Sequence, residues 1–362
     1  MRRWRRVMGL LVVRPAVCRT TLLGLLMLVG ALSACAGRAP RPQGPAPQPP
    51  PGGRGPSAPS LPAAPGRGAP EPVEGLSLRL ELGARGSGTV VRVDLETYVR
   101  DVVVGEIAVA APDGPLARPV YEAQAIVART YALAVRGRHA ADGFDLCSTT
   151  HCQVYQPDQW RRSRWAAEVD AAVRRTRGRF LASAGRPIEA VFHAHCGGHT
   201  SAAAEVWRSV GAPYLQGVDD PFCLREQAAP WTATLPLDTL RTALNRRPRT
   251  EVGDRLDGVQ VLRRDAGGRV VEVAVSGTRA PVVTGEDFRL AVLAAAGPRS
   301  LRSARFDVQR VGADLVFTGR GSGHGVGLCQ TGLIGRLRAG QSAEQALAAY
   351  YPGAILTSVG GT

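Results

Sequence analysis

The sequence contains no lysine, so all 45 of its basic side chains are arginines. The formal net charge is +15, a balance that suits anionic partners such as acidic polymers or lipid headgroups, or that reflects codon bias in a GC-rich genome. No RNP, helix-turn-helix or zinc-finger pattern accompanies the charge, so we expect no nucleic-acid partner. Aromatic residues are scarce at 5%, but 44% of the 362 residues are hydrophobic, enough for one large domain or two small ones.

Long hydrophobic runs are also missing. The apolar run at residues 22–32 is too short to span a bilayer, and it follows a strongly basic start. Residues 1–35 are therefore predicted to be a signal peptide. The run ends in Leu32-Ser33-Ala34-Cys35, which resembles the bacterial lipobox, so we expect a lipoprotein of the cell envelope anchored to a membrane at Cys35. No Asp follows Cys35, so delivery to an outer membrane stays open. The alternative is an ordinary signal peptide cut near Ala34 or Ala36.

The chain after Cys35 divides by composition. Residues 36–75 are rich in Pro, Gly, Ala and Arg and have almost no branched apolar residues, which predicts a disordered tether. Residues 76–362 carry the patterns of ordered structure, and residues 231–297 could form a separate lobe within them. Strand and helix patterns do not alternate strictly, which favours an α+β fold with mixed or antiparallel sheets and packed helices.

Periodicity and capping residues locate several elements of this ordered region. Alternating leucines predict a strand at residues 76–82, and a second strand follows at residues 89–93. Apolar positions at helical spacing predict helices after Asp94, at residues 120–135 and at residues 164–177. Further strands are expected at residues 179–182 and 188–193, joined by a turn at residues 185–187, and at residues 259–262 and 270–275, which are expected to pair as a hairpin across residues 266–268. Capping-box patterns predict helix starts at Thr284 and Ser342.

A short stretch of the chain is crowded with metal ligands. Cys147, His151 and Cys152 lie within six positions, and His139 is close enough in sequence to complete a Cys₂His₂ set. Thiolate and imidazole are preferred tetrahedral ligands of Zn²⁺, and four protein ligands would make such a site structural. The alternative is a disulfide between Cys147 and Cys152 in an oxidising compartment.

An ordered series of motifs resembles the SpoIID/LytB family. The matching motifs span most of residues 76–353. In chain order they are Val103-Val104-Gly105-Glu106, Glu122-Ala123-Gln124-Ala125, Ala128-Arg129-Thr130-Tyr131-Ala132, the cysteine stretch, Cys196-Gly197-Gly198-His199-Thr200, Glu205-Val206-Trp207, Pro213-Tyr214-Leu215, and Gly319-Arg320-Gly321-Ser322-Gly323-His324-Gly325-Val326-Gly327 with Gln330.

This resemblance implies a peptidoglycan lytic transglycosylase. Such an enzyme cuts glycan strands, preferably without stem peptides, between N-acetylmuramic acid and N-acetylglucosamine and leaves 1,6-anhydromuramic ends. Glu106 matches the family's catalytic glutamate, acting first as acid and then as base. One carboxyl suffices because the attacking hydroxyl belongs to the substrate, whereas hydrolysing glycosidases usually need two. The chain departs from the common Glu-Met-Pro pattern in reading Glu106-Ile107-Ala108.

Other residues are weaker candidates for the functional site. His324, Gln330 and Arg129 are candidate glycan contacts, although the glycines around His324 could equally form a structural turn cluster. The glycine stretch lacks the Gly-Lys-Ser/Thr ending of a phosphate loop, so we expect no nucleotide. Glu122 is a rival acid, but a helical position near arginines makes an ion-paired role more ordinary.

The remaining cysteines and histidines leave alternatives open. The resemblance implies a disulfide between Cys196 and Cys223, which would leave Cys329 without an evident partner, as a buried small hydrophobe. His193, His195 and His199 would share one face of a continued strand and could form a second metal site.

Two other functions compete with the transglycosylase. The LytB branch implies a glycan-binding protein that enhances an N-acetylmuramoyl-L-alanine amidase without cutting glycans itself. A zinc hydrolase that uses the cysteine stretch directly is disfavoured, because a zinc ion with four protein ligands has no open position for water.

Overall fold

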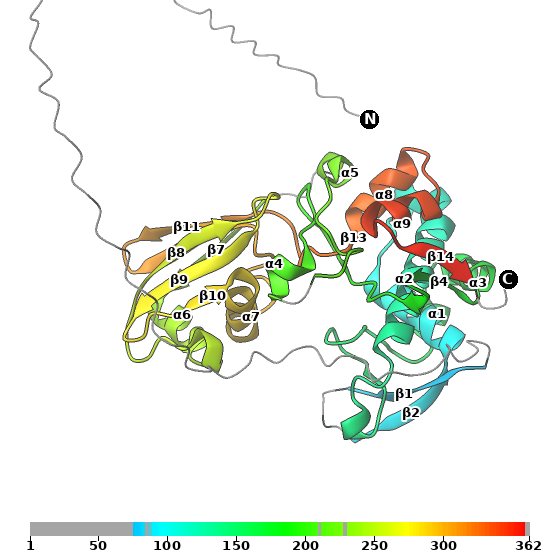
Figure 1. Ribbon diagram of the computed structural model, residues 1–362, viewed down its shortest axis with the longest axis horizontal. Helices are drawn as coiled ribbons and strands as arrows, with labels where there is room; N and C mark the ends of the chain where they lie inside the picture. The colour runs from blue at the N-terminus through cyan, green and yellow to red at the C-terminus, as the bar shows by residue number, and fades with distance from the viewer. Residues whose placement is uncertain (1–74, 84–85, 87, 209–210, 227–229, 359–362) are drawn as a thin grey trace, which may run out of the picture. The chain divides into compact units, whose positions relative to one another are not determined.

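The computed structural model describes residues 75–83, 86, 88–208, 211–226 and 230–358 (Figure 1). The predicted signal peptide, Cys35 and the predicted tether up to residue 74 lie outside these residues. Within the described residues, no helix combines the length and the apolar character needed to cross a membrane.

The first hydrophobic core is built around three helices. Helix α1 (Leu95–Glu106) begins where expected, because the Asp94 side chain accepts hydrogen bonds from the backbone N–H groups of Glu96 and Thr97. Helix α2 (Ala117–Val135) begins three residues before the predicted start, and α3 is Ala166–Arg175. Both α1 and α3 pack on α2, whose small residues are almost all buried.

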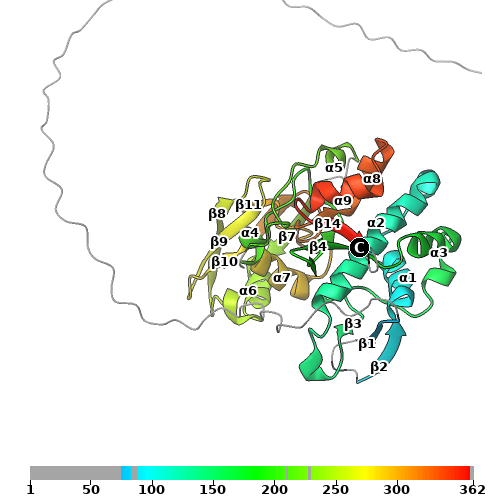
Figure 2. The same cartoon turned by 45° about the vertical axis from the view of Figure 1, so that its right-hand side comes forward.

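Small sheets complete this core. The predicted strand pair is confirmed as β1 (Ser77–Glu81) antiparallel to β2 (Val90–Asp94), and β3 (Leu146–Cys147) joins β1 in parallel (Figure 2). Because β3 ends at Cys147, this pairing anchors the start of the cysteine stretch. The other strands are β4 (Arg179–Ser183) between β5 (Arg186–Pro187) and β14 (Ile355–Ser358), and the pair β6 (Phe192–His193) and β13 (Leu328–Cys329).

The strand expected at residues 188–193 is largely wrong. Only Phe192 and His193 are strand residues, and Arg186 and Pro187, which were expected to form a turn, pair with β4 instead. Ile188 and Ala190 are fully buried, so the apolar run reflects burial in an irregular segment rather than regular pairing.

Short helices and turns link these parts and complete the set of described elements in this region. They are η1 (Ala111–Leu116), η2 (Ala140–Asp142), η3 (Trp160–Arg162), α4 (Ala203–Trp207), α5 (Pro221–Arg225), α8 (Gln330–Arg338) and α9 (Ala343–Tyr350). The predicted capping box at the start of α9 is present, with the Ser342 hydroxyl and the Gln345 side chain each bonded to the other residue's backbone N–H.

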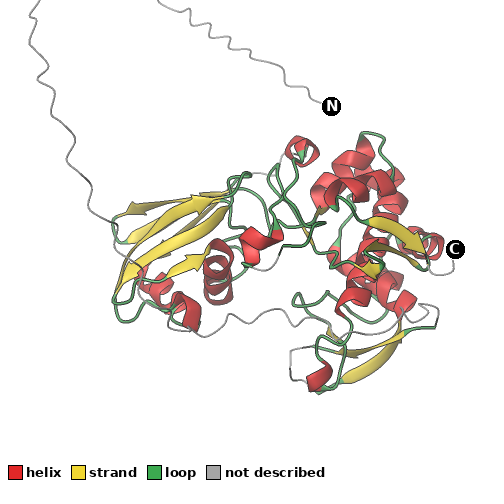
Figure 3. Ribbon diagram, in the orientation of Figure 1, coloured by secondary structure: helices red, strands yellow, loops and turns green. Residues whose placement is uncertain are grey.

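A second hydrophobic core lies between residues 231 and 317. It contains the predicted hairpin, with β8 antiparallel to β9 and Val259 opposite Val275, and a second sheet of order β11-β12-β7. Helices α6 and α7 pack on this strand-rich part (Figure 3). Its elements are β7 (Trp231–Pro236), α6 (Leu237–Leu244), η4 (Pro248–Thr250), β8 (Leu256–Arg264), β9 (Val270–Gly277), β10 (Val282–Thr284), α7 (Gly285–Ala296), β11 (Phe306–Val311) and β12 (Asp314–Gly319).

The fold class is therefore α+β, as the sequence predicted. Helices and small mixed or antiparallel sheets share the chain without a repeating strand–helix unit. Helix α7 begins after Thr284, whose hydroxyl accepts a hydrogen bond from the Asp287 N–H, so this predicted helix start is confirmed as well.

The cap of α1 can be tested by mutation. Asp94→Ala removes the acceptor for two otherwise unpaired N–H groups, and we expect it to lower the free energy of unfolding by about 1 kcal/mol. Asp238→Ala is a matched control, because Asp238 lies in the first turn of α6, is almost fully exposed and forms only a loose ion pair with Arg241. The control should change stability by less than about 0.5 kcal/mol in urea denaturation. Equal effects of the two substitutions would contradict the capping role.

Candidate active site and metal centre

Glu106 is the last residue of α1. Burial raises the pKa of Glu106 above its ordinary value, and a hydrogen bond from the Val154 N–H acts in the opposite direction. The carboxyl is thus held where the protonated form persists to higher pH than in water.

One short hydrogen bond joins Glu106 to the cysteine stretch. The Val154 N–H donates to Glu106 Oε1 at 2.5 Å. Gly105 makes this approach possible, because a Cβ at that position would lie 2.8 Å from the carbonyl oxygen of Val154. The glycine therefore has a steric role at the helix end, although glycine within a helix is unfavourable by itself.

The segment that carries Val154 is also anchored about two turns earlier on α1, at Tyr98. The Tyr98 hydroxyl donates to Gln153 Oε1 at 2.9 Å, and the rings of Tyr98 and Tyr155 stack with centroids 5.5 Å apart. An open hollow in the surface lies beside this segment and is lined in part by Leu82, Thr149, Val154 and Tyr155.

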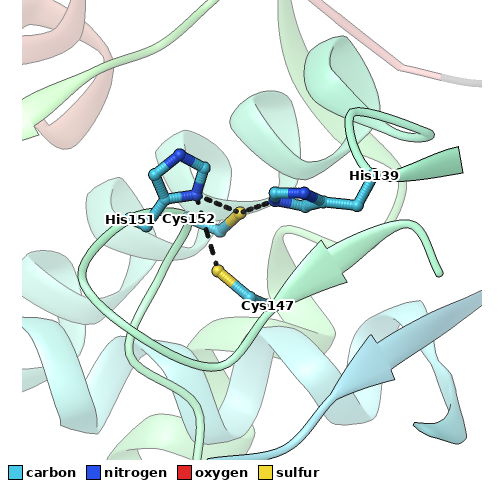
Figure 4. Close-up of side chains that lie close together, drawn as sticks. All are labelled: His139, Cys147, His151 and Cys152. Atoms are coloured by element: carbon cyan, nitrogen blue, oxygen red, sulfur yellow. Dashed lines mark hydrogen bonds between the residues drawn. The ribbon is translucent and has the colours of Figure 1, made fainter. Parts of the chain in front are cut away.

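The predicted metal ligands lie together. One ligand atom each of His139, Cys147, His151 and Cys152 is within 4.8 Å of the other three (Figure 4). Cys152 Sγ is 3.4 Å from His139 Nε2, and His151 Nδ1 is 3.6 Å from both sulfurs. Cys147 and Cys152 are free thiols, so the alternative of a disulfide between them is not what this structure contains.

The surroundings of this cluster fit a tetrahedral metal site. His139 is buried, its Nδ1 lies 3.5 Å from Asp142 Oδ2, and its Nε2 faces Cys152. A carboxylate on the far ring nitrogen is the usual arrangement for a ligating histidine, since it leaves the other nitrogen free to bind the metal. Burial raises the pKa of the Cys152 thiol to about 12, so binding a metal there must displace a proton.

Gln330 contacts the Glu106 residue through its backbone. The Gln330 side chain is buried and donates from Nε2 to the carbonyl oxygen of Glu106 at 3.0 Å and to Gln124 Oε1 at 3.4 Å. The residue predicted to touch a glycan therefore positions the end of α1. The two motifs are more than 200 residues apart in sequence, so spacing could not reveal their pairing.

Arg129 is not a glycan contact, and that prediction is wrong. Its side chain is fully buried and forms a two-bond ion pair with Glu96, at 2.8 and 2.7 Å, while Nη1 donates to the carbonyl oxygen of Arg179. Arg129 therefore has a structural role on the buried face of α2. Glu122 pairs with Arg175 at 2.8 Å, which matches the ordinary ion-paired role expected for the rival acid.

Both ring nitrogens of His324 are bonded to backbone groups. Val326 N–H donates to Nδ1 at 3.1 Å, so the proton on Nε2 points to the Phe192 carbonyl at 2.9 Å. Burial lowers the pKa of His324 to about 4, and the ring is neutral at neutral pH. Trp207 lies against it with ring centroids 5.2 Å apart and is 38% exposed. Trp207 belongs to one of the family motifs, but it was not named as a candidate glycan contact from the sequence.

The glycines around His324 are packing positions. A Cβ on Gly327 would meet the Val191 carbonyl oxygen at 2.1 Å, and one on Gly323 would meet the His193 side chain at 2.8 Å. Both residues also have positive φ angles. The glycine run therefore allows close approach to the segment around β6, which favours the structural alternative considered for it.

The remaining cysteines and histidines are arranged differently from what the sequence suggested. Cys196 and Cys223 are free thiols, so the implied disulfide is absent, and Cys329, which was expected to lack a partner, lies beside them with Asp220. Among the described residues, His193, His195 and His199 are not grouped as metal ligands: His193 contacts the Val326 carbonyl and His199 faces Asp219.

The fold and the site define an α+β protein in which a cluster of thiols and imidazoles fixes a segment against a carboxyl at a helix end. The family model described as Stage II sporulation protein, SpoIID, matches residues 84–182, and a domain of unknown function, DUF8618, matches residues 224–327.

Curated relatives cover most of the described chain. Stage II sporulation protein D of Bacillus subtilis is 28% identical over 73% of this chain and 75% of its own length. The amidase enhancer of the same organism is 28% identical over 66% of this chain but only 38% of its own length. An uncharacterized protein of Brachyspira hyodysenteriae is 32% identical over 72% of this chain. The matched region covers 66% of that relative's length, just under two thirds. Residues 84–182 thus match the SpoIID domain, and the chain resembles the SpoIID/LytB family over most of the described residues.

The raised pKa of Glu106 predicts how stability depends on pH. A carboxyl whose pKa is higher in the folded protein than in the unfolded chain costs stability once pH rises through the folded-state value. Glu106→Gln keeps an oxygen acceptor for the Val154 N–H but cannot ionise. We therefore expect the Tm of E106Q minus that of the wild type to increase as pH rises from about 4 to about 8. A difference that is constant or falls with pH would show that burial does not dominate at this carboxyl.

Proposed function

We propose that this protein is a peptidoglycan lytic transglycosylase with Glu106 as its single acid and base. The observation that carries the proposal is the environment of that carboxyl: burial favours its protonated form, and the Val154 N–H at 2.5 Å favours its ionised form. A carboxyl whose protonated and ionised forms are both stabilised can give up a proton and take one back within a catalytic cycle. The family is linked to cell-wall degradation, which gives the substrate class.

The proposed reaction uses Glu106 twice. The protonated carboxyl donates to the glycosidic oxygen as the bond from C1 of N-acetylmuramic acid breaks. The carboxylate then accepts the proton of the C6 hydroxyl of the same sugar, whose oxygen forms the new bond to C1. In the described residues, no hydrogen bond or ion pair joins Glu106 to a second carboxylate, and this chemistry requires none.

Several parts of the chain hold Glu106 in place for these steps. Gln330 fixes the backbone of Glu106, and the segment after Cys152 supplies the N–H group that orients the carboxyl. The exposed face of Trp207 beside His324 offers an apolar surface on which a sugar ring could stack, so we propose these two side chains as glycan contacts.

We further propose that His139, Cys147, His151 and Cys152 hold a structural zinc ion. A bound zinc ion would cross-link the segment between these residues and leave no position for water. Within this proposal, the metal site acts on catalysis only through the position of Val154, two residues after Cys152. The zinc-hydrolase alternative has no support in this geometry.

Two further proposals concern where the protein acts and with what. Lipidation at Cys35 would tether the domain to a membrane of the cell envelope through residues 36–75, so that it reaches wall glycans from a fixed point. A second candidate function, enhancement of an N-acetylmuramoyl-L-alanine amidase by glycan binding alone, is favoured by the similarity to the amidase enhancer of Bacillus subtilis.

Substitution of the acid separates these two functions. Glu106→Gln should reduce the release of 1,6-anhydromuramic products from glycan strands without stem peptides by at least about 100-fold, since it removes general acid–base catalysis. Binding of the same strands should persist. Glu122→Gln is the matched control, because Glu122 is ion-paired with Arg175 rather than placed at the helix end, and it should leave product release near the wild-type rate.

Mass spectrometry of the digested strands provides the measurement. Unchanged product release by E106Q would refute the catalytic role of Glu106. If the wild-type protein leaves the strands uncut but binds them and stimulates an amidase, the second candidate function is correct. Products with ordinary reducing ends would identify a hydrolase instead.

Loss of the proposed zinc should disorder the segment that holds Glu106. Cys147→Ser is expected to lower zinc content and to expose residues 139–155 to protease, with loss of glycan cleavage although Glu106 is intact. Thr150→Ala changes an exposed neighbour that is not a ligand, and it should have none of these effects. Full activity of a zinc-free Cys147→Ser protein would exclude the proposed role of the metal.

A further inference from the structure

A second group of ligand atoms lies in the first hydrophobic core, apart from the Cys147 cluster. The thiols of Cys196, Cys223 and Cys329 and a carboxylate oxygen of Asp220 all lie within 4.8 Å of one another. All four residues are fully buried. They come from the segment after β6, the start of α5 and the junction of β13 with α8, so the chain brings together residues up to 133 positions apart.

One disulfide cannot account for this group. A bond between two of the sulfurs would leave the third thiol buried in contact with it, in a position to exchange. Three thiols and a carboxylate are instead a complete donor set for one tetrahedral ion. Ligands about 2.3 Å from a zinc ion lie about 3.7 Å from one another in a tetrahedron, so the group needs only a small contraction to bind it.

Backbone amides already point at the sulfurs. Cys329 Sγ accepts from the N–H groups of Cys196 and Gly332, at 3.2 and 3.3 Å, and Cys196 Sγ accepts from the Gly198 N–H at 3.3 Å. A neutral thiol is a weak acceptor, whereas a thiolate is a strong one. Three such bonds at two buried sulfurs would stabilise the thiolates that a metal ion binds. In the protonated form, the Cys196 thiol donates to Asp220 Oδ2 at 3.4 Å and the Cys329 thiol faces the Ala194 carbonyl oxygen at 3.9 Å.

The carboxylate is held by groups outside the cluster. The Tyr350 hydroxyl donates to Asp220 Oδ2 at 2.7 Å, and Arg336 Nη2 is 3.8 Å from Oδ1. Gly332 allows α8 to lie this close, since a Cβ there would be 2.0 Å from Asp220 Oδ2. Such outer partners orient ligating carboxylates in metal sites, and the arginine offsets part of the negative charge that three thiolates and a carboxylate would place around one Zn²⁺ ion.

His195 completes the surroundings as a donor rather than a ligand. Its Nδ1 accepts from the Gly197 N–H at 3.0 Å, which leaves the proton on Nε2. That Nε2 atom is buried and forms no hydrogen bond of normal geometry, and its interaction with the Cys223 sulfur favours the thiolate form of that residue. A buried N–H without an acceptor costs free energy unless a negative charge lies beside it, and a metal-bound Cys223 thiolate would supply that charge.

We propose that Cys196, Asp220, Cys223 and Cys329 form a second structural site for a thiophilic divalent cation, zinc in the first place. Binding displaces the three thiol protons to solvent and involves no change of oxidation state. The ion would join α5 to the start of α8, where Gln330 follows Cys329 directly and bonds to the backbone of Glu106. The distances and contacts that support this metal site do not depend on the transglycosylase proposal.

Peptide mapping of the wild-type full chain, purified without reductant or chelator, provides a test that needs no variant. We expect Cys196, Cys223 and Cys329 to be found as free thiols, to resist alkylation in the native protein, and to react after a zinc chelator is added. A peptide pair joined by a Cys196–Cys223 disulfide would overturn the proposal. So would alkylation of these thiols at the same rate with and without the chelator.

Zinc content then assigns the ion. Cys329→Ser should lower zinc by one ion per chain relative to the wild type, whether or not the Cys147 cluster is loaded, and Cys147→Ser should leave the Cys329-dependent ion in place. Zinc content unchanged by Cys329→Ser in a folded protein, judged by circular dichroism, would overturn the proposal. If that variant does not fold, mapping of the wild-type protein decides alone. Because neither measurement uses glycan cleavage, the site and the enzymatic function fail or stand separately.

Discussion

The bond from the Val154 N–H to Glu106 Oε1 connects the two parts of the site. On one side it ends at the carboxyl of the last residue of α1, where burial favours the neutral form. On the other side it begins in the segment that follows four candidate metal ligands, whose ligand atoms lie within 4.8 Å of one another. The charge state of Glu106 therefore depends on a backbone amide two residues after Cys152. The steric requirement at Gly105 belongs to the same constraint, since the segment can approach only a helix end without a side chain.

Local chemistry made much of the fold predictable from sequence. Asp94, Thr284 and Ser342 each accept a hydrogen bond from a first-turn N–H, and each predicted helix begins where its cap indicated. The hairpin of β8 and β9 was readable because its strands alternate and are close in sequence. The grouping of the four candidate ligands of the Cys147 cluster could be predicted for the same reason: they lie within 14 positions, from His139 to Cys152, in one stretch of chain. Where the determinants of a structure are neighbours in sequence, their spacing carries the information.

Contacts between segments that are distant in sequence could not be predicted in this way. Arg129 was taken for a glycan contact because it belongs to a family motif, but its partner is Glu96 on another helix. Cys329 was taken for an isolated apolar residue because the two nearest thiols in space are more than 100 positions away. Gln330 was predicted to contact a glycan, whereas its side chain bonds to the Glu106 backbone, a contact that only the packing of α8 reveals. A motif identifies a residue that matters, and tertiary packing decides whether it touches substrate, backbone or another side chain.

The absence of lysine has a structural consequence that is separate from the net charge. Four of the arginines in the described residues form two or more hydrogen bonds with one carboxylate: Arg129 with Glu96, Arg289 with Glu286, Arg338 with Asp113 and Arg79 with Asp145. The first two pairs are buried. A planar guanidinium can satisfy both carboxylate oxygens at once, which an ammonium group cannot do with fixed geometry. Breaking such a buried pair on one side leaves an uncompensated charge. Arg129 therefore fixes the position of α2 against α1, whereas the pair of Arg289 and Glu286 lies within α7. The positive charge of the sequence therefore overstates the charge that is free to attract an anionic polymer, because part of it is used inside the fold.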